Sequence, residues 1–433
     1  MPEWTRPKKA TLSKNAQIGS DTAMDLHTGT FYWPNRLPDP PSYPALDSDL
    51  SCDVLIIGAG ISGAQCGYYL SELGQDVVIV EKGKAGLGST CTNTAVLQYA
   101  GDKMAHELAD SFGETAAIRH LKLCREAIDD MEAAIRDIGR DTEFERRDSL
   151  YYASAKKDVA KLEKDFALLT RNGFSLDLLT EKQIRQRYPF SKHAALYIYG
   201  DAEMNPYAFT LGLLETAHAR GVRIYENTKI TGKKLNKDGT AFILTDGSCQ
   251  IRARTVIVAA GCESLAFKRE QNASVISSYA VISNPVDDLS MWSDRTLIWE
   301  TARPYMYMRT TKDNRIIIGG LDEKTASANK RDSMLPQKRE KLIQKFNELF
   351  PGLNVQPAYQ LAAFYGGSRD GLPMIGMYDD YPGWYFLFAY GDSGIVYSML
   401  LAKILRDVII SGSHPDLGLY RQQRPGVHEQ PVI

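Results

Sequence analysis

The sequence VLIIGAGISGAQCGYYLSELGQDVVIVEKG, residues 54–83, has the order of a strand, a glycine-rich turn, a helix and a second strand. Its glycines Gly58, Gly60 and Gly63 form a G-x-G-x-x-G pattern directly after an apolar run. The second apolar run ends at Glu81, 18 residues after Gly63. A strand, this glycine pattern, a helix and a late acidic residue together are typical of a dinucleotide-binding unit. We therefore predict a dinucleotide site here.

Each of these residues has a physical role at such a site. Gly58 permits a tight turn, Gly60 lets a pyrophosphate approach the backbone, and Gly63 allows the helix to pack closely on the strand. The amides and the positive dipole end of the helix face the phosphates. Glu81 would accept hydrogen bonds from ribose hydroxyls and disfavour a 2′-phosphate. The predicted site also includes the intervening residues Ala59, Ile61 and Ser62.

Three later segments indicate that the dinucleotide is FAD. Residues 83–95, GKAGLGSTCTNTA, suit a loop that passes under a pyrophosphate toward a flat ring, and residues 255–261, TVIVAAG, form another apolar strand. Residues 390–395, YGDSGI, begin a helix whose positive end can stabilise negative charge on a flavin. The sequence has no second G-x-G-x-x-G pattern and no C-x₄-C pair. These segments add Gly88, Ser89, Thr90, Asn93, Thr94, Ala95, Ala260, Gly261, Gly391, Asp392, Ser393, Gly394 and Ile395 to the predicted FAD site.

Composition narrows the class of protein. The 433 residues carry a net charge of −2, which argues against a basic face for nucleic acid, and their number favours two or more domains. The start of the chain lacks the apolar segment of a secretory signal, and charged residues interrupt the apolar region 395–410. We therefore expect a cytoplasmic protein with no integral membrane segment. The six cysteines have no metal-ligand spacing, so we expect free thiols and no metal.

Several helices are indicated by caps and periodicity. A helical pattern runs from 103 to 139, and Thr180 with Gln183 forms a capping box before residues 181–187. Asn205 and Pro206 are typical of a helix start, and that helix should end at Gly221. Two further helices are expected, one near 336–349 and one ending near 411.

The chain resembles the D-amino-acid oxidase superfamily of FAD-dependent oxidoreductases, in the branch with glycine, sarcosine and γ-glutamylputrescine oxidases. The resemblance rests on IIGAGISGAQCGYYL, GST at 88–90, NPYAFTLGLLETAHARGVRIYENTKI, VIVAAG, YMYMRTTKDNRIIIGG, DGLPMIG and AYGDSGI. It covers roughly residues 30–412 and implies five more FAD-site residues, Lys82, Ile230, Gly371, Leu372 and Pro373. The N-terminal half also resembles members with an appended Rieske domain, which this sequence is not expected to contain.

The resemblance implies an α/β fold in which a Rossmann-like FAD-binding domain is interleaved with a substrate domain built on a mostly antiparallel sheet. Residues 1–49, which hold five prolines between Pro34 and Pro44, are predicted to form an N-terminal arm, pinned to the surface by Phe31, Tyr32 and Trp33. The FAD-binding domain is assigned to 50–145, 196–264 and 362–433, and the substrate domain to 146–195 and 265–361.

The family oxidises C–N bonds of amines by hydride transfer to flavin N5, and oxygen or another acceptor reoxidises the flavin. Tyr305 and Tyr307 should face away from Met306 and Met308 on one strand, and Arg309 continues the tyrosine face. Arg309 also falls where related oxidases place a carboxylate-binding arginine, so the three residues Tyr305, Tyr307 and Arg309 are the candidate substrate site. A structural ion pair of Arg309 is the alternative, and the sequence leaves both open.

Three positions depart from relatives. Phe364 lies near the place where some sarcosine-oxidase relatives attach FAD through a cysteine, so we expect non-covalent FAD. Ile395 and Val396 lie where those relatives have a lysine for the substrate carboxylate, which favours a longer amine over an N-methyl amino acid. Asp392 would repel a reduced flavin, so we expect it to point away or to cap the next helix.

Two other functions stay open. One is an FAD-dependent dehydrogenase of a 2-hydroxy acid or polyol phosphate, which needs a base that is often histidine. None of the seven histidines lies on a strand expected at the flavin, which disfavours this function. The other is a flavin subunit of a larger dehydrogenase complex. The predicted partner is a small amine substrate, and the oligomeric state is left open.

Overall fold

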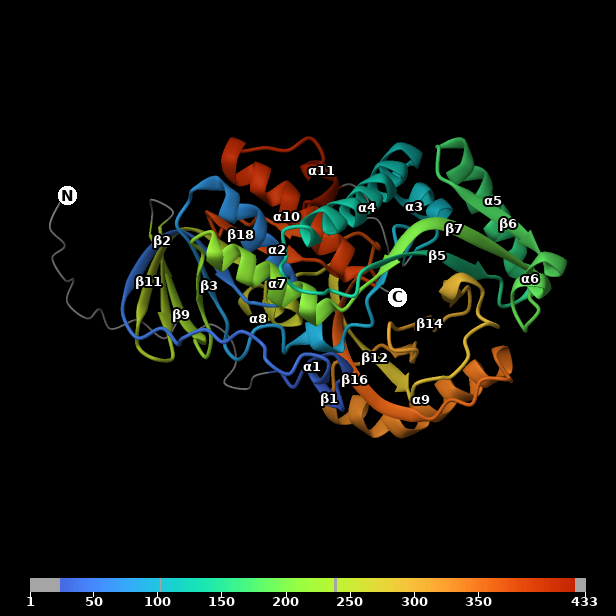
Figure 1. Cartoon of the computed structure of the whole chain (residues 1–433). Coiled ribbons are helices and arrows are strands. Elements are labelled where there is room, and N and C mark those ends of the chain that lie inside the picture. Colours follow the sequence, from blue (N-terminus) through green and yellow to red (C-terminus); the bar gives the residue numbers. More distant parts are fainter. Residues whose placement is uncertain (1–23, 102, 237–239, 425–433) are drawn as a thin grey trace, which may run out of the picture.

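Two β-sheets lie next to each other in the computed structural model, and helices cover them (Figure 1). The structure describes residues 24–101, 103–236 and 240–424. The chain passes from one sheet to the other several times, so each sheet contains strands from distant parts of the sequence. The predicted α/β class with two interleaved sheets is therefore confirmed.

The first sheet has eight strands in the order β17-β18-β11-β2-β3-β8, extended by β10 and β9. The strands from β18 to β8 are parallel, and they are apolar because helices or further strands bury both faces. The strands are β2 (Leu50–Ile57), β3 (Val77–Val80), β8 (Arg223–Tyr225), β9 (Ile230–Leu235), β10 (Ala241–Thr245), β11 (Gln250–Val258), β17 (Met374–Gly376) and β18 (Trp384–Phe388).

Helix α2 (Ile61–Leu70) follows the glycine turn and packs between α7 (Pro206–Ala219) and α10 (Gly394–Ser411). The start of α7 is as predicted, because the Asn205 side chain accepts a hydrogen bond of 3.0 Å from the Ala208 amide. The capping box of Thr180 and Gln183 is also present, and it begins α6 (Glu181–Arg187).

The single helical segment predicted for 103–139 is wrong in one respect. It is divided into α3 (Ala105–Phe112) and α4 (Glu114–Ile135), because Gly113 adopts a φ of +84° that a continuing helix cannot use. Helix α9 (Ala328–Leu349) likewise begins earlier than 336, with Ser327 as its cap. The remaining helices are α1 (Tyr32–Asn35), α5 (Val159–Arg171), α8 (Ser264–Phe267) and α11 (Leu417–Tyr420).

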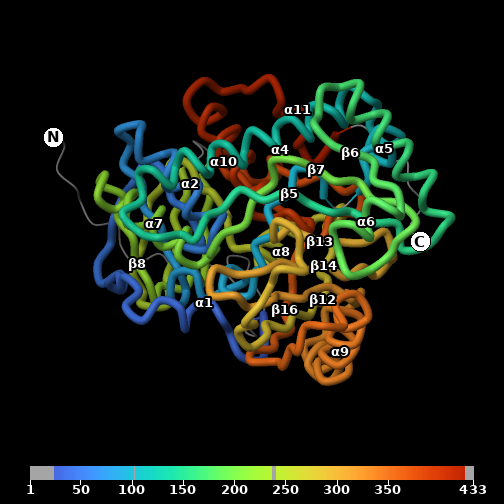
Figure 2. Tube along the Cα trace, turned by 45° about the vertical axis from the view of Figure 1, so that its right-hand side comes forward, coloured from blue at the N-terminus to red at the C-terminus, as the bar shows by residue number. Residues whose placement is uncertain are grey.

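The second sheet has ten strands, in the order β1-β16-β12-β15-β14-β13-β5-β7-β4 with β6 beside β7. Its pairs are antiparallel except for β13 with β5. Helix α9 covers the face away from α4 and α10 (Figure 2). The strands are β1 (His27–Gly29), β4 (Val96–Leu97), β5 (Glu145–Tyr152), β6 (Leu176–Thr180), β7 (Ala194–Glu203), β12 (Ala273–Ser283), β13 (Leu297–Glu300), β14 (Met306–Thr310), β15 (Ile316–Glu323) and β16 (Pro357–Ser368).

The described part of the N-terminal arm is built into the second sheet. Strand β1 pairs with β16, and Tyr32 and Trp33 in α1 are buried, so the predicted pinning by these aromatic residues is confirmed. Residues 1–23 of the arm and 425–433 of the last predicted segment lie outside the described residues. Strands β7 and β16 cross the predicted boundaries at 196 and 362, and the domain boundaries stay a prediction.

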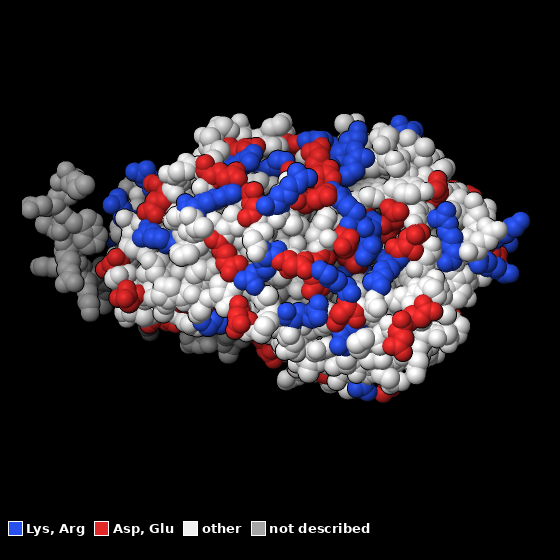
Figure 3. Space-filling view, in the orientation of Figure 1, with Lys and Arg blue, Asp and Glu red and all other residues white. Residues whose placement is uncertain are grey.

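Neither the surface charges nor the cysteine thiols point to a particular function. On the face in Figure 3, acidic and basic side chains are interspersed, as the near-zero net charge predicts. Among the helices of the described ranges, none is both long and apolar enough to cross a membrane. All six cysteines are free thiols and are buried.

Candidate active site

The glycine turn has the shape that the sequence predicts. Gly58 has a φ of +109°, and a Cβ there would lie 2.6 Å from the Ala259 carbonyl oxygen. A Cβ on Gly63 would lie 1.9 Å from the Gly58 oxygen, so both glycines are required by the backbone itself. Gly60, the N-cap of α2, differs because a Cβ there would meet only the Thr90 Oγ1 within 4 Å, at 3.3 Å. The turn therefore leaves open space beside Gly60, where a phosphate could approach.

Glu81 closes the other side of this turn. Its carboxylate accepts hydrogen bonds from the amides of Ala59 at 2.9 Å and Gly83 at 3.0 Å. Burial raises the pKa of Glu81. The carboxylate thus sits at the end of β3 beside the helix start, as a ribose acceptor would. Lys82 points elsewhere, because it forms an ion pair of 2.6 Å with Glu263.

Residues 88–95 continue from this turn toward the second sheet. Gly88 caps a short 3₁₀ turn, Ser89–Thr92, and the Thr90 hydroxyl accepts a hydrogen bond of 3.0 Å from the Ile61 amide. Ala95 follows with a φ of +51°, and its amide donates to the Asn93 side chain at 2.7 Å. Ser62, in the first turn of α2, stays partly exposed. The segment therefore connects the phosphate turn to a cavity farther along.

Three side chains hold residues 93–95 in place. The Arg309 Nε donates to the Thr94 carbonyl at 2.7 Å, and the Trp33 indole donates to the Asn93 carbonyl at 2.7 Å. The Thr94 hydroxyl donates to the Tyr307 hydroxyl at 3.1 Å. A residue of the arm and two of β14 thus fix the loop.

The Arg309 guanidinium is fully engaged in contacts within the protein. Its side chain is 2% exposed, and it also donates to the carbonyls of Thr310 at 3.1 Å and Met204 at 2.8 Å. The carboxylate of Glu203 lies 3.3 Å away. Since Arg309 does not line the cavity described below, the geometry favours the structural ion pair over the carboxylate-binding role.

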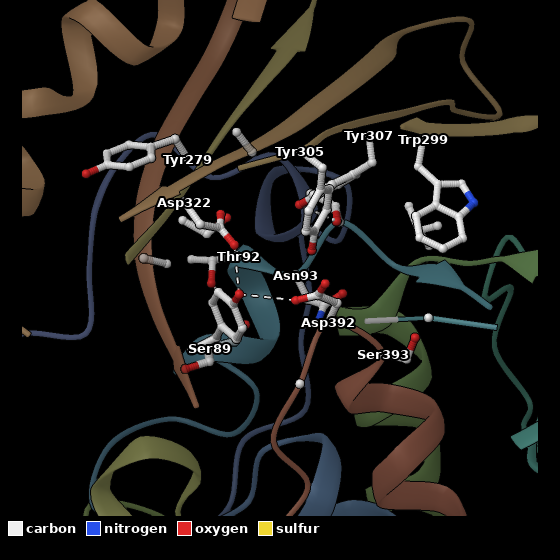
Figure 4. Close-up of a pocket in the computed structure, with 18 of the residues that line it drawn as sticks. Ser89, Thr92, Asn93, Tyr279, Trp299, Tyr305, Tyr307, Asp322, Asp392 and Ser393 are labelled. Carbon is white, nitrogen blue, oxygen red and sulfur yellow. Dashed lines mark hydrogen bonds between the residues drawn. The ribbon is translucent and has the colours of Figure 1, made fainter. Parts of the chain in front are cut away.

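The cavity lies where the two sheets meet, and Figure 4 shows its lining. Its open space is about 920 Å³, including the mouth. Tyr305 and Tyr307 line it, whereas Met306 and Met308 are buried on the other face, as the strand alternation predicts. The predicted FAD residues Ser89, Asn93, Thr94, Gly391, Asp392 and Ser393 also line it.

Asp392 does not cap helix α10, which is one of the two orientations that we expected. The N-cap of α10 is Ser393, and no side-chain hydrogen bond caps this helix. The Asp392 carboxylate instead lies in the cavity and accepts a hydrogen bond of 3.1 Å from the Tyr365 hydroxyl. Gly391, with a φ of +128°, donates its amide to the Gly366 carbonyl at 2.8 Å and so turns Asp392 inward.

The other predicted FAD residues surround the first sheet and do not line the cavity. Ala260 and Gly261 follow β11, where the Gly261 carbonyl accepts from the Tyr390 hydroxyl at 2.9 Å. Ile230 begins β9 within the apolar cluster of the first sheet. Gly371, Leu372 and Pro373 precede β17, and the Arg424 guanidinium donates hydrogen bonds to the carbonyls of Leu372 and Pro373. Gly394 and Ile395 form the first turn of α10.

The sequence did not single out several lining residues, among them two that determine the polarity of the cavity. Tyr365 on β16 donates from its hydroxyl to Asp322 on β15 at 2.7 Å. The Asp322 Oδ1 atom is buried and has no hydrogen-bond partner. Burial and the neighbouring Asp392 raise the pKa of Asp322 to about 6. A carboxylate directly after the apolar run IIIGGL was the available signal, and the missed lining residues are Thr92, Val96, Gln98, Gly101, Ser278, Tyr279, Ala280, Trp299, Asp322, Leu361, Ala363 and Tyr365.

Comparison with known proteins agrees with this geometry. Residues 53–408 match the family described as DAO, FAD dependent oxidoreductase. The chain belongs to this family. It is therefore an enzyme, an FAD-dependent oxidoreductase, and the glycine turn, Glu81 and the 88–95 loop are suited to hold FAD.

Individual relatives are distant. The chain is 24% identical over 397 residues to γ-glutamylputrescine oxidoreductase of Escherichia coli K12, covering 89% of this chain and 90% of that one. It is 29% identical over 226 residues to a putative Rieske 2Fe-2S iron-sulfur protein, YhfW, of Bacillus subtilis, covering 52% of this chain and only 43% of the relative. The fold of glycine oxidase from Geobacillus kaustophilus matches with a TM-score of 0.70 at 18% identity, over 83% of this chain and 95% of that one.

Proposed function

We propose that this oxidoreductase oxidises the C–N bond of a small amine. FAD, when bound, accepts a hydride equivalent from the carbon next to the neutral nitrogen, and oxygen or another acceptor takes the electrons onward. The amine becomes an iminium ion, which water hydrolyses to a carbonyl compound and a free amine or ammonia. Relatives that are named as glycine oxidase and γ-glutamylputrescine oxidoreductase support this class of reaction.

The observation that carries the proposal is the position of the cavity. One side of it is lined by Asn93, Thr94 and Ser393, which are predicted FAD residues, and strands of the second sheet line the opposite side. A substrate in this space lies between the cofactor segments and the aromatic residues Trp299 and Tyr305. Large aromatic walls exclude water and orient a small molecule with few polar contacts.

The chain's own residues supply positioning and charge. Helix α10 begins beside the cavity, so its positive end favours negative charge at that edge. Ser393 and Thr94 offer hydroxyls, and Tyr307 is held by Thr94 at 3.1 Å. These groups orient a ligand without an acid–base triad, as a reaction of a neutral amine requires.

The lining also weighs against the alternative dehydrogenase. Among the described residues that line the cavity there is no histidine, lysine or arginine. A hydroxy acid or a polyol phosphate needs a cationic partner for its carboxylate or phosphate, and the cavity wall offers none. An amine substrate has no such need.

The test is anaerobic mixing of the FAD-loaded enzyme with separate amines, N-methyl amino acids and hydroxy acids. Loss of the oxidised flavin's visible absorption should occur with amines and not with hydroxy acids. Bleaching by hydroxy acids alone would overturn the proposal. No bleaching by any compound, but activity restored by a co-purifying protein, would instead assign the chain to a larger complex.

A further inference from the structure

Two carboxylates share one hydroxyl inside the cavity. The Tyr365 hydroxyl lies 2.7 Å from the Asp322 Oδ2 and 3.1 Å from the Asp392 Oδ1, and dashed lines in Figure 4 mark such contacts beside these labelled acids. A hydroxyl has one proton, so it can donate fully to only one of the two at a time. The acids come from β15 and from the loop before α10, so the two sheets bring them together.

One oxygen of Asp322 has no hydrogen-bond donor, although the Ser278 hydroxyl lies nearby. The Asp322 Oδ1 is buried with no hydrogen-bond partner, and an ionised carboxylate can only accept. A buried acceptor without a donor is costly, which points to a ligand that supplies the donor. The group that fits best is an ammonium, which carries three donors, no acceptor and a positive charge.

The surrounding walls also suit a cation. Trp299 is stacked on Tyr151 with ring centroids 3.7 Å apart, and Tyr305 and Tyr307 lie 5.9 Å apart at the same cavity. Aromatic faces attract ammonium groups, more strongly when water is excluded.

The nearest basic residue on the loop between β13 and β14 is held by other groups. Arg303 interacts electrostatically with Asp392, but it does not line the cavity. Its guanidinium donates to the carbonyls of Glu300 at 3.2 Å and Ala302 at 3.0 Å, and it lies 5.1 Å from the Tyr305 ring centre. A substrate carboxylate would therefore have to displace these contacts and also approach two acids.

We propose that Asp322 and Asp392, joined by Tyr365, bind the ammonium group of a diamine-type substrate that carries no carboxylate. This inference rests on the proposed function, because the nitrogen that is oxidised must be neutral when it reacts. An ammonium that stays paired with the acids is therefore a second nitrogen of the same molecule. The substrate class is an alkyl chain with one amine oxidised at the flavin and one held as a cation.

The first test compares three amines of equal chain length on the FAD-loaded enzyme: putrescine, butylamine and γ-aminobutyrate. They end in an ammonium, a methyl group and a carboxylate respectively. We expect kcat/KM to be highest for putrescine, by roughly tenfold or more over butylamine, because a hydrogen bond to a charged group is lost. A preference for γ-aminobutyrate would overturn the inference and leave amine oxidation standing.

Three variants locate the effect. Asp322→Asn and Asp392→Asn should each lower the ratio of kcat/KM for putrescine to kcat/KM for butylamine by roughly tenfold. Glu323→Gln is the matched control, since Glu323 is the next residue on β15 and pairs with Lys338 at 2.6 Å outside the cavity. Equal losses for putrescine and butylamine would assign the acids to the chemistry of every amine, and would refute a site for the second nitrogen.

A binding measurement separates this inference from the proposed reaction. tert-Butylammonium has three N–H donors, and the carbon next to its nitrogen carries no hydrogen, so it cannot be oxidised and its binding can be followed as a change in the flavin absorption spectrum. It should bind to the wild type and to Glu323→Gln, and more weakly by roughly tenfold to Asp322→Asn. If it binds in this way while no amine is oxidised, the acid site stands and the proposed function fails. If acetate binds instead, the acid site is wrong.

Discussion

Replacing Arg309 by alanine tests whether this arginine supports the FAD loop or holds a substrate carboxylate. Arg309 donates to three backbone carbonyls, of Thr94, Thr310 and Met204, at 2.7 to 3.1 Å, and its side chain is 2% exposed. Water cannot readily replace these donors in a buried site. Each carbonyl left without a partner costs about 1–3 kcal/mol.

Loss of the ion pair between Arg309 and Glu203 destabilises the protein further, but by less than the loss of an isolated buried pair. Breaking a buried pair destabilises a protein by about 3–5 kcal/mol when the remaining charge is unpaired. Glu203 keeps Arg147 at 3.1 Å, so its charge is not left alone. We therefore expect Arg309→Ala to lower the free energy of unfolding by at least about 3 kcal/mol, and to weaken FAD binding because Thr94 loses its support.

Urea unfolding of the FAD-loaded and FAD-free forms measures both effects, and released FAD measures the cofactor content. Arg254→Ala is the control, since Arg254 is 81% exposed in its ion pair of 3.4 Å with Asp53 and should cost at most about 1 kcal/mol. Unchanged stability and FAD content, with a loss confined to carboxylate-bearing amines, would refute the structural role.

Three further predictions concern the cofactor and the cavity. Gly60→Ala should abolish FAD retention while the FAD-free protein stays folded, because the new methyl group meets only Thr90 in the protein. Gly139→Ala is the control, since a methyl group there meets open space. Normal FAD binding by Gly60→Ala would contradict the predicted site. FAD should be released intact by acid, since Phe364 cannot bond to it, and colour that stays with the denatured protein would disprove this. Asp322 lies near Asp392, Tyr365, Ser278 and Lys338, and its pKa is raised to about 6. Because only the ionised carboxylate attracts a cation, the affinity for tert-butylammonium should fall as the pH drops through about 6, and a flat profile would count against Asp322.

Local sequence patterns were sufficient to predict much of the FAD site. The turn at Gly58 and Gly63 could be predicted because backbone crowding leaves glycine as the residue that fits. The start of α7 could be predicted because the Asn205 cap acts within three residues of chain. The break at Gly113 was missed, since the apolar spacing continues across it and only the φ of +84° divides the helices.

The substrate side could be predicted only in part. Strand alternation placed Tyr305 and Tyr307 on one face and Met306 on the other, because successive side chains of a strand point to opposite sides. Alternation does not say how far the cavity extends along that face. Arg309 shares the face with the tyrosines, yet it lies beyond the cavity, beneath residues 93–95.

The sequence by itself determined the family, the dinucleotide turn and the presence of FAD, because these depend on residues within a few positions of each other. The tertiary structure decided which groups meet at the substrate. Arg309 reaches Thr94 across 215 positions, and Tyr365 joins Asp322 and Asp392 across 43 and 27 positions. Such pairs depend on the register of β14, β15 and β16 and on how the two sheets meet. No local spacing contains that information, so the acidic character of the cavity emerged only when the sheets were assembled.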